Sequence, residues 1–196
     1  MLLLVRHGQS TWNAEGRCQG QSLDAGGLSA DGEAQALATA EELAKKFAAD
    51  PQPRADTILA SDLLRARQTA QIIADVLGLP IQLDAGLREQ SLGELEGKLY
   101  TEQFGELTVQ GTIDELWRDP FRTPPGGESV SDMYYRVQAT LTRLSLCLTP
   151  LVRPGRTLVV ATHGGVVRTA TAPQPRPGTS IPHATVDNAS ITPWSL

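Results

Sequence analysis

Several features that mark whole classes of protein are scarce in this sequence. It has only two cysteines, Cys18 and Cys147, which match no metal-ligand spacing and are too few for a disulfide framework. No stretch approaches the roughly 18 apolar residues of a membrane helix, and the N-terminal run at residues 2–5 is too short for a signal-peptide core. We therefore expect a cytoplasmic protein with free thiols and no membrane partner.

Positive charge is also in short supply. The chain has 17 Lys and Arg against 22 Asp and Glu, a formal net charge of −5, which gives no overall attraction to nucleic acid or to an anionic membrane. A small anion can then bind only through a local cluster of arginines. At 196 residues, of which 40% are hydrophobic and 20% charged, the chain is expected to form one globular domain over residues 1–196.

Strand-like and helix-like hydrophobic patterns alternate along most of the chain. Ser29 is expected to cap the first long helix, and Ser61 or Asp62 the second. The alternation predicts an α/β fold with a mainly parallel sheet. The predicted segments are strands at 2–5, 57–60, 81–83 and 158–162, long helices at 30–49, 61–77 and 129–148, short helices at 100–104 and 113–117, and a loop at 120–127.

Histidine is scarce too, but two of the three histidines stand in the same context. His7 and His163 each end a strand-like run and are followed by glycine, whereas His183 lies in no such pattern and is interpreted as solvated or structural. Arg6 precedes His7, and Arg65 falls in the first turn of the second long helix. Because ligands of parallel sheets bind beyond the carboxyl ends of the strands, these side chains are expected to converge.

Two histidines and two arginines in one crevice favour phosphoryl chemistry. The planar guanidinium of arginine matches a phosphoryl group, and a helix N-terminus adds free amides for an anion. A neutral imidazole can attack phosphorus and form a phosphohistidine, while the surrounding cations stabilise the transition state without a metal. The leaving alkoxide needs a proton, for which Glu89, Glu94 and Glu96 are the candidates.

A set of motifs extends the pattern over residues 2–168. In order, these motifs are Leu3-Leu4-Val5-Arg6-His7-Gly8-Gln9-Ser10-x-x-Asn13, Gly16-Arg17-Cys18-Gln19-Gly20, Ala60-Ser61-Asp62-Leu63-Leu64-Arg65-Ala66-Arg67-Gln68-Thr69-Ala70, Leu87-Arg88-Glu89 with Gly93-x-x-Glu96-Gly97, Pro125-Gly126-Gly127-Glu128-Ser129, and Thr162-His163-Gly164-Gly165. The tripeptide Arg-His-Gly is weak evidence by itself, but the ordered set is specific. Together the motifs resemble those of the histidine phosphatase superfamily, the phosphoglycerate mutase-like proteins.

The resemblance implies a three-layer α/β/α sandwich with a mainly parallel central sheet, like that of phosphoglycerate mutase, and no cofactor or metal. It places the phosphorylated histidine at His7 and the proton donor at Glu89, with Glu96 structural. The remaining implied contacts to phosphate or substrate are Arg6, Ser10, Asn13, Gly20, Arg65, His163 and Gly164.

The chain departs from the family pattern in three places. The turn at residues 24–29 is one residue longer than usual, and Leu95 replaces an aromatic residue. Prolines in the Pro/Gly-rich loop at residues 171–182 are expected to cut short the helix that follows His163. Residues 186–192 resemble the family's closing strand, so an atypical C-terminal edge of the sheet is expected.

The leading functional interpretation is a metal-independent phosphomonoester phosphatase acting through a phosphohistidine on a small phosphorylated metabolite. A phosphoglycerate mutase is the alternative, but the segment at residues 102–119 is short and rather acidic, whereas such mutases carry longer basic insertions. A member that binds phosphorylated ligands without catalysis is the third interpretation, and a homodimer is left open. Arg67 is assigned to the surface or to a salt bridge, and Trp12, Trp117 and Trp194 to packing. For Glu94, Glu96 and Glu128 two interpretations stay open, a functional carboxylate or a simple loop charge or helix-cap partner.

Overall fold

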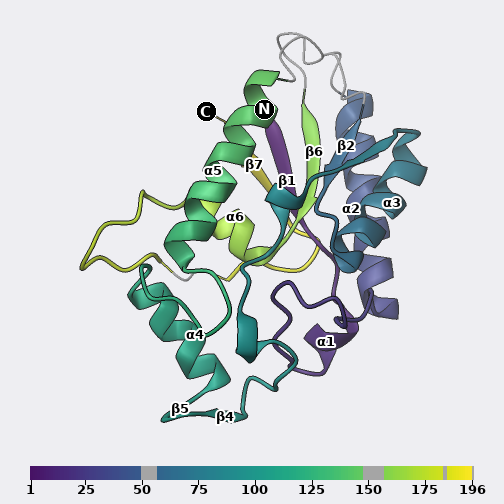
Figure 1. Ribbon diagram of the computed structural model, residues 1–196. Helices are drawn as coiled ribbons and strands as arrows, with labels where there is room; N and C mark the ends of the chain where they lie inside the picture. Colours follow the sequence, from purple (N-terminus) through teal and green to yellow (C-terminus); the bar gives the residue numbers. More distant parts are fainter. Residues whose placement is uncertain (50–56, 148–156, 183–184, 196) are drawn as a thin grey trace.

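A five-stranded, mainly parallel sheet forms the centre of the computed structural model, which describes residues 1–49, 57–147, 157–182 and 185–195 (Figure 1). The strand order is β3-β2-β6-β1-β7, and only the edge strand β7 is antiparallel to its neighbour. The crossed order places β1 and β6, which both end at a histidine, side by side at the middle of the sheet. The strands are β1 (Leu2–Arg6), β2 (Ile58–Ala60), β3 (Ile81–Leu83), β6 (Leu158–Thr162) and β7 (Ile191–Trp194).

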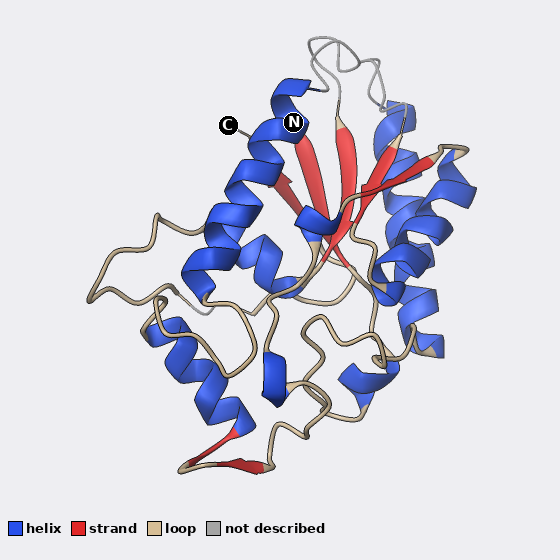
Figure 2. Ribbon diagram, viewed as in Figure 1, coloured by secondary structure: helices blue, strands red, loops and turns tan. Residues whose placement is uncertain are grey.

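Helices cover both faces of this sheet, as the three-layer expectation required (Figure 2). On one side lie α2 (Ala30–Ala49) and α3 (Leu64–Leu77), and on the other α5 (Val130–Cys147) and α6 (Gly164–Thr171). Side chains that alternate along a strand serve the two layers in turn, so that Leu2 and Leu4 join one core cluster while Leu3 and Val5 join the other. Burial on both faces explains why β1 and β6 are apolar throughout.

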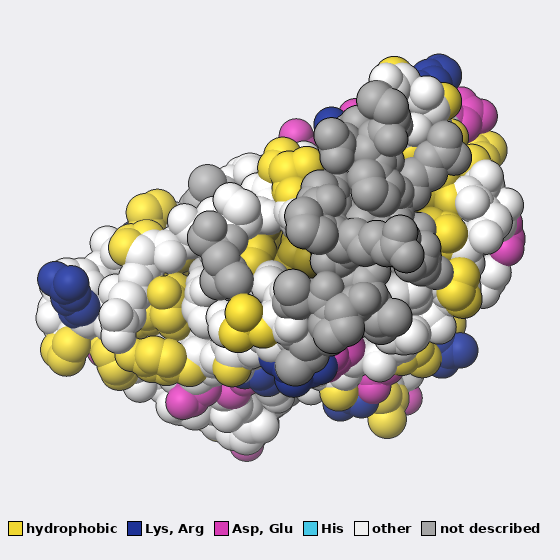
Figure 3. Space-filling view, turned by 90° about the horizontal axis from the view of Figure 1, so that it is seen from above, with side chains coloured by type: hydrophobic (Ala, Val, Ile, Leu, Met, Phe, Trp, Pro, Cys, Tyr) yellow, Lys and Arg dark blue, Asp and Glu magenta, His cyan; other side chains and the backbone are white. Residues whose placement is uncertain are grey.

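The remaining elements lie near the carboxyl ends of the parallel strands. They are α1 (Thr11–Ala14), the 3-10 turns η1 (Ala85–Leu87) and η2 (Gly93–Leu95), the small hairpin β4 (Gln103–Phe104) and β5 (Leu107–Thr108), and α4 (Val109–Arg118). Figure 3 shows the opposite end of the molecule, where β1 begins. No histidine is visible among the described side chains on that face. The loops that could build a site therefore gather at one end of the molecule.

Most predicted elements are present, but residues 100–104 and the cap of α3 differ from the prediction. Residues 100–104 form a turn that enters β4 instead of a helix, because the Tyr100 carbonyl accepts a hydrogen bond from Gln110 and the chain folds back on α4. Ser29 caps α2 by accepting from the Gly32 amide, as predicted. The residue before α3 is Leu63, which has no side-chain cap, so the predicted cap at Ser61 or Asp62 is wrong.

The predicted closing strand is displaced toward the C-terminus. Residues 186–188 are not in the sheet, and β7 pairs with β1 only from Ile191 onward. The cause is a turn at Ala189, whose φ of 57° is left-handed. As predicted, α6 ends at Thr171, ahead of the prolines. His183 and the end of the predicted helix at residue 148 lie outside the described residues, as does the side chain of Cys147.

Candidate active site

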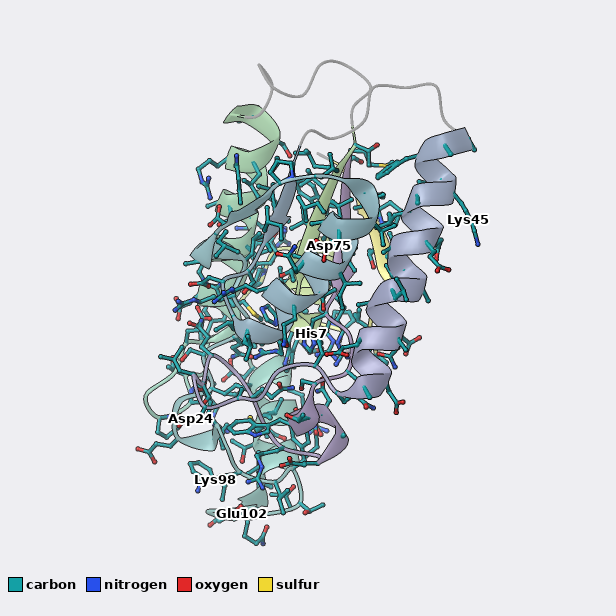
Figure 4. All side chains as sticks on the ribbon, turned by 90° about the vertical axis from the view of Figure 1, so that its right-hand side faces the viewer. His7, Asp24, Lys45, Asp75, Lys98 and Glu102 are labelled. Atoms are coloured by element: carbon teal, nitrogen blue, oxygen red, sulfur yellow. The ribbon has the colours of Figure 1, made fainter. Side chains whose placement is uncertain are left out.

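Three neighbouring parallel strands deliver polar side chains to one point beyond their carboxyl ends. His7 follows β1, Ser61 follows β2, and His163 follows β6 and precedes the first residue of α6. The His7 and His163 rings meet edge to face, with 5.3 Å between their centroids. Figure 4 shows His7 inside the molecule, near the point where the strands end, whereas Lys45 points outward from α2. The predicted convergence of the two histidines is thus a property of the fold.

The hydrogen bonds of His7 fix its tautomer. Its Nδ1 lies 2.6 Å from the carbonyl oxygen of Gly8, and since a carbonyl can only accept, Nδ1 carries the proton. The other ring nitrogen, Nε2, accepts from Arg65 Nε–H at 3.2 Å. The His7 ring is only 3% exposed, and burial lowers the pKa of His7 well below its ordinary value, with the charges of Arg65 and Arg6 lowering it further. At neutral pH, His7 is therefore an uncharged imidazole with its lone pair on Nε2.

Two arginines supply permanent positive charge beside this lone pair. Arg65 enters from the first turn of α3, is 2% exposed, and also donates to the Gly20 carbonyl at 2.9 Å. Burial lowers the pKa of Arg65 to about 10, so it stays protonated at neutral pH. Arg6 donates to the Val186 carbonyl through Nη1, while its buried Nε has no partner among the described residues. An unpaired buried donor of this kind is available to an anion.

The C-terminal segment completes the support of His7. The His7 carbonyl accepts from Asn188 Nδ2 at 3.1 Å and from the Ala189 amide at 3.2 Å. Because Val186 also binds Arg6, the residues predicted as a closing strand are instead drawn to the site. This use of residues 186–189 is the physical reason that the strand starts late.

Glu89 brings a carboxylate to the same place from the loop between η1 and η2. Its Oε2 accepts from the Gly165 amide at 3.0 Å, and its Oε1 accepts from the Gln90 amide at 2.9 Å. A Cβ at position 165 would lie 2.1 Å from Glu89 Oε1, so the close approach requires glycine. The negative charge of Glu89 raises the pKa values of Arg6 and Arg65 against the effect of their burial, which places the carboxylate within electrostatic reach of both.

An ion-paired arginine holds the backbone of the Glu89 loop. Arg136, from α5, donates to the carbonyls of Gly86, Arg88 and Glu89 at 3.0, 2.9 and 3.2 Å and pairs with the Glu128 carboxylate. Arg88 pairs with Asp62 through bonds of 2.7 and 2.5 Å, which lowers the pKa of Asp62 and occupies the carboxylate that was predicted to cap α3. Glu89 is thus carried by a loop tied both to α5 and to the turn between β2 and α3.

The described part of the chain holds no cluster of three or more His, Cys, Asp or Glu side chains that could bind a metal ion. It also holds no helix long and apolar enough to cross a membrane.

Comparison with known proteins identifies the family to which this site belongs. Over residues 2–195, the chain matches the family model of the histidine phosphatase superfamily (branch 1). The chain belongs to the histidine phosphatase superfamily. Phosphoglycerate mutase-like protein 4 of Arabidopsis thaliana is 36% identical to it over 168 residues, which cover 85% of this chain and 67% of the relative. A glucosyl-3-phosphoglycerate phosphatase of Mycolicibacterium vanbaalenii is 38% identical over 174 residues, 87% of this chain and 72% of the relative.

Solved structures agree with this assignment. The structure of a mycobacterial glucosyl-3-phosphoglycerate phosphatase in complex with VO3 aligns with a TM-score of 0.80 and 30% identity, over 97% of this chain and 88% of that chain. These similar proteins carry the names of phosphatases and of mutase-like proteins, so this histidine phosphatase superfamily member is an enzyme. The predicted family and fold are confirmed.

In this member of the superfamily, most of the predicted site residues border one cavity of about 210 Å³. His163 is not among the lining residues; it is fully buried, and its ring lies edge to face against that of His7. Ser10 is also buried and outside the lining, and its hydroxyl caps α1 and donates to Gln19 Oε1 at 2.7 Å. Glu96 accepts the amides of Gln21 and Leu92, as its predicted structural role requires. The predicted residues that line the cavity are Arg6, His7, Asn13, Gly20, Arg65, Glu89 and Gly164.

The outer wall of the cavity contains residues that the motifs did not reveal. Tyr100, Gln110 and Ile113 come from the weakly patterned middle segment. Arg168, from α6, stacks on the Trp117 ring with 5.4 Å between guanidinium carbon and ring centroid, so the assignment of Trp117 to packing alone is incomplete. Arg168 could have been found from its spacing, because it lies one helical turn after Gly164 and Gly165 on the same face.

Proposed function

We propose that this enzyme is a phosphomonoester phosphatase in which His7 carries the phosphoryl group. The observation that carries the proposal is the state of His7: a neutral, buried ring whose protonated Nδ1 is bound to a carbonyl and whose Nε2 lone pair lies at a cavity lined by Arg6 and Arg65. A nucleophile must keep its lone pair at working pH, and cations beside it stabilise the charge that develops on the phosphoryl oxygens.

The reaction proceeds in two displacements. When the phosphomonoester binds, Arg65 Nε–H leaves His7 Nε2 for a phosphoryl oxygen, which frees the lone pair. His7 Nε2 then attacks phosphorus, the N–P bond forms, and the P–O bond to the alcohol breaks while Glu89, in its protonated form, gives its proton to the leaving oxygen. The product alcohol leaves. Glu89, now a carboxylate, takes a proton from a water molecule that attacks phosphorus, the N–P bond breaks, and phosphate and free His7 are released. The loop position of Glu89, over the His163–Gly165 turn, supports this dual role.

The substrate that fits is a small phosphorylated metabolite with a second negative group. The cavity of about 210 Å³ is small, and Arg168 adds a third positive charge to a lining that also includes Tyr100 and Gln110. Burial lowers the pKa of Arg168, and the Glu89 charge acts against that effect. Relatives named for glucosyl-3-phosphoglycerate and phosphoglycerate support a phosphorylated sugar acid as the class to test first.

The test is an assay of the purified protein with EDTA present, using p-nitrophenyl phosphate and 3-phosphoglycerate derivatives. We expect phosphate release, inhibition by orthovanadate, and an acid-labile phosphoenzyme that is absent from His7→Ala. Release that survives His7→Ala would overturn the assigned nucleophile. A separate incubation with 3-phosphoglycerate and catalytic 2,3-bisphosphoglycerate tests the mutase alternative, and isomerisation faster than hydrolysis would favour it. No release and no isomerisation would leave the non-catalytic interpretation.

A further inference from the structure

One polar contact next to the site has no role in the steps above. The hydroxyl of Ser61, directly after β2, lies 2.8 Å from Nε2 of His163, and both side chains are fully buried at 0% exposure. The other ring nitrogen of His163, Nδ1, is one of two buried side-chain nitrogens without a hydrogen-bond partner among the described residues. The second is Arg6 Nε, which belongs to the anion site. An unpaired buried nitrogen costs stability unless a ligand uses it.

The direction of the Ser61–His163 bond follows from the other contact of the hydroxyl. Ser61 Oγ accepts from the Leu63 amide at 3.3 Å. Within the described part of the chain, His163 Nε2 is the only acceptor that the hydroxyl proton can reach. If Nε2 were itself protonated, two donors would face each other or the Ser61 proton would be left unpaired. The hydroxyl therefore donates to Nε2, and the ring proton of the neutral imidazole resides on Nδ1.

We infer that Ser61 is a positioning residue that fixes His163 as the Nδ1–H tautomer, so that this N–H is a hydrogen-bond donor to the phosphoryl group. The inference rests on the proposed function, because it supplies a phosphoryl group beside His7. Both histidines then carry their proton on Nδ1, but one acts as a nucleophile and the other as a hydrogen-bond donor. His7 turns its proton toward the Gly8 carbonyl and presents a nucleophilic lone pair, whereas His163 turns its lone pair toward Ser61 and presents a donor.

The charge of the site explains why a neutral donor is useful at this position. Burial is the largest cause that holds the pKa of His163 well below its ordinary value. Four described ionisable groups lower this pKa further: Arg65, His7, Arg136 and Arg6. A second imidazolium beside two arginines would be repelled when no anion is bound. A neutral ring can still donate, provided that its tautomer is fixed by a partner such as Ser61.

Nuclear magnetic resonance of the ¹⁵N-labelled, ligand-free protein tests the tautomer directly. Long-range ¹H–¹⁵N spectra distinguish a protonated from an unprotonated ring nitrogen, and loss of signals in His163→Asn assigns the ring. We expect His163 to show a protonated Nδ1 and an unprotonated Nε2. The reverse pattern in the wild-type protein would overturn the inference, whether or not the protein hydrolyses phosphoesters.

Ser61→Ala tests the consequence for the anion. Without the hydroxyl, Nε2 has no donor and the proton is free to occupy it, so the ring loses its donor at Nδ1. We expect the dissociation constants of inorganic phosphate and orthovanadate to rise about tenfold to a hundredfold, the range for a hydrogen bond to a charged group. Both constants are binding measurements, so they are separable from a failure of the proposed phosphatase activity.

Thr57→Val is the matched control. Thr57 lies just before β2 and Ser61 just after it, so the two residues stand at opposite ends of the same strand. The buried hydroxyl of Thr57 donates to the Pro80 carbonyl at 3.1 Å, and Thr57 does not line the cavity. We expect this variant to lose stability without a change in the His163 tautomer or in phosphate affinity. Phosphate affinity that stays within twofold of wild type in Ser61→Ala, or that falls equally in both variants, would overturn the role of Ser61.

Discussion

The main-chain N–H of Gly165 donates to Glu89 Oε2 across 3.0 Å, which joins the proton donor of the proposed mechanism to the helix that begins after His163. The contact thereby fixes the loop of Glu89 against the first turn of α6 at the cavity. The position of the carboxylate relative to His7 then depends on a residue without a side chain, because any Cβ at position 165 would occupy the place of Glu89 Oε1.

The first prediction follows from this contact. Gly165→Ala is expected to displace the Glu89 carboxylate and lower kcat by roughly 10- to 100-fold for substrates with basic leaving groups, since general acid catalysis contributes about 10²–10⁴-fold. For p-nitrophenyl phosphate, whose leaving group needs little protonation, the loss is expected to be smaller. Steady-state assays over a series of aryl and alkyl phosphates measure the difference.

The control for this prediction is Gly111→Ala. Gly111 lies in the first turn of α4, much as Gly165 lies in the first turn of α6, but a Cβ there would meet its neighbours at ordinary contact distances of 3.4 Å and beyond. Its kcat is expected to remain near that of wild type. A loss in Gly165→Ala that is the same for every leaving group would argue that the substitution acts on something other than the proton donor.

The second prediction concerns the outer wall of the cavity. Arg168→Gln is expected to raise KM for 3-phosphoglycerate-type substrates about tenfold, because a charged hydrogen bond of roughly 1.5–3 kcal/mol to the substrate carboxylate is lost. Values of kcat/KM for p-nitrophenyl phosphate, which has no carboxylate, are expected to change little. Equal effects on both substrates would assign Arg168 to the structure of the pocket instead.

How much of this site was visible in the sequence depends on how local its signals are. His7 and His163 are predictable because each directly follows a strand, and Arg65 because it lies in the first turn of the helix after β2, so that neighbours in the sequence fix the place of all three. The position of Arg168 follows from its spacing to Gly164 and Gly165, but its contact with Trp117 does not, because that contact joins α6 to α4 and is indicated by the pattern of neither helix. Residues 186–189 were assigned to a strand since their polar bonds to Arg6 and His7 are long-range contacts.

The third prediction is a dependence of stability on pH. Folding lowers the pKa values of His7 and His163 below those of the unfolded chain, so the unfolded state binds more protons in the acid range. Their stabilising contribution is therefore fully present above a pH of about 6.5 and declines as the pH falls below that value. The slope is about 1.4 kcal/mol per pH unit for each histidine that stays neutral.

Urea unfolding between pH 7.5 and pH 5 measures this slope. In His163→Asn, one titrating group is removed, and the free energy of unfolding should fall less steeply on acidification than in the wild-type protein. The comparison between the two proteins cancels the contribution of the carboxylates that they share. Parallel pH profiles for the two proteins would mean that His163 is not held neutral by the fold.

The fourth prediction tests the ion pair that carries the Glu89 loop. Arg136→Met keeps much of the apolar stem of the side chain but removes the donors to the Gly86, Arg88 and Glu89 carbonyls and leaves Glu128 without its cation. We expect a loss of about 2 kcal/mol in the free energy of unfolding, less than the 3–5 kcal/mol for a fully buried pair, because both partners are partly exposed.

The same substitution is expected to reduce kcat beyond what the loss of stability explains, since the loop that holds Glu89 would no longer have a fixed backbone. Arg118→Met is the matched control, as its pair with Glu115 lies at the surface of α4, where ion pairs contribute about 0–1 kcal/mol. Thermal unfolding and kcat for both variants, measured at a temperature where each is folded, separate the two effects. If Arg136→Met kept wild-type kcat with a basic leaving group, the position of Glu89 would not depend on Arg136.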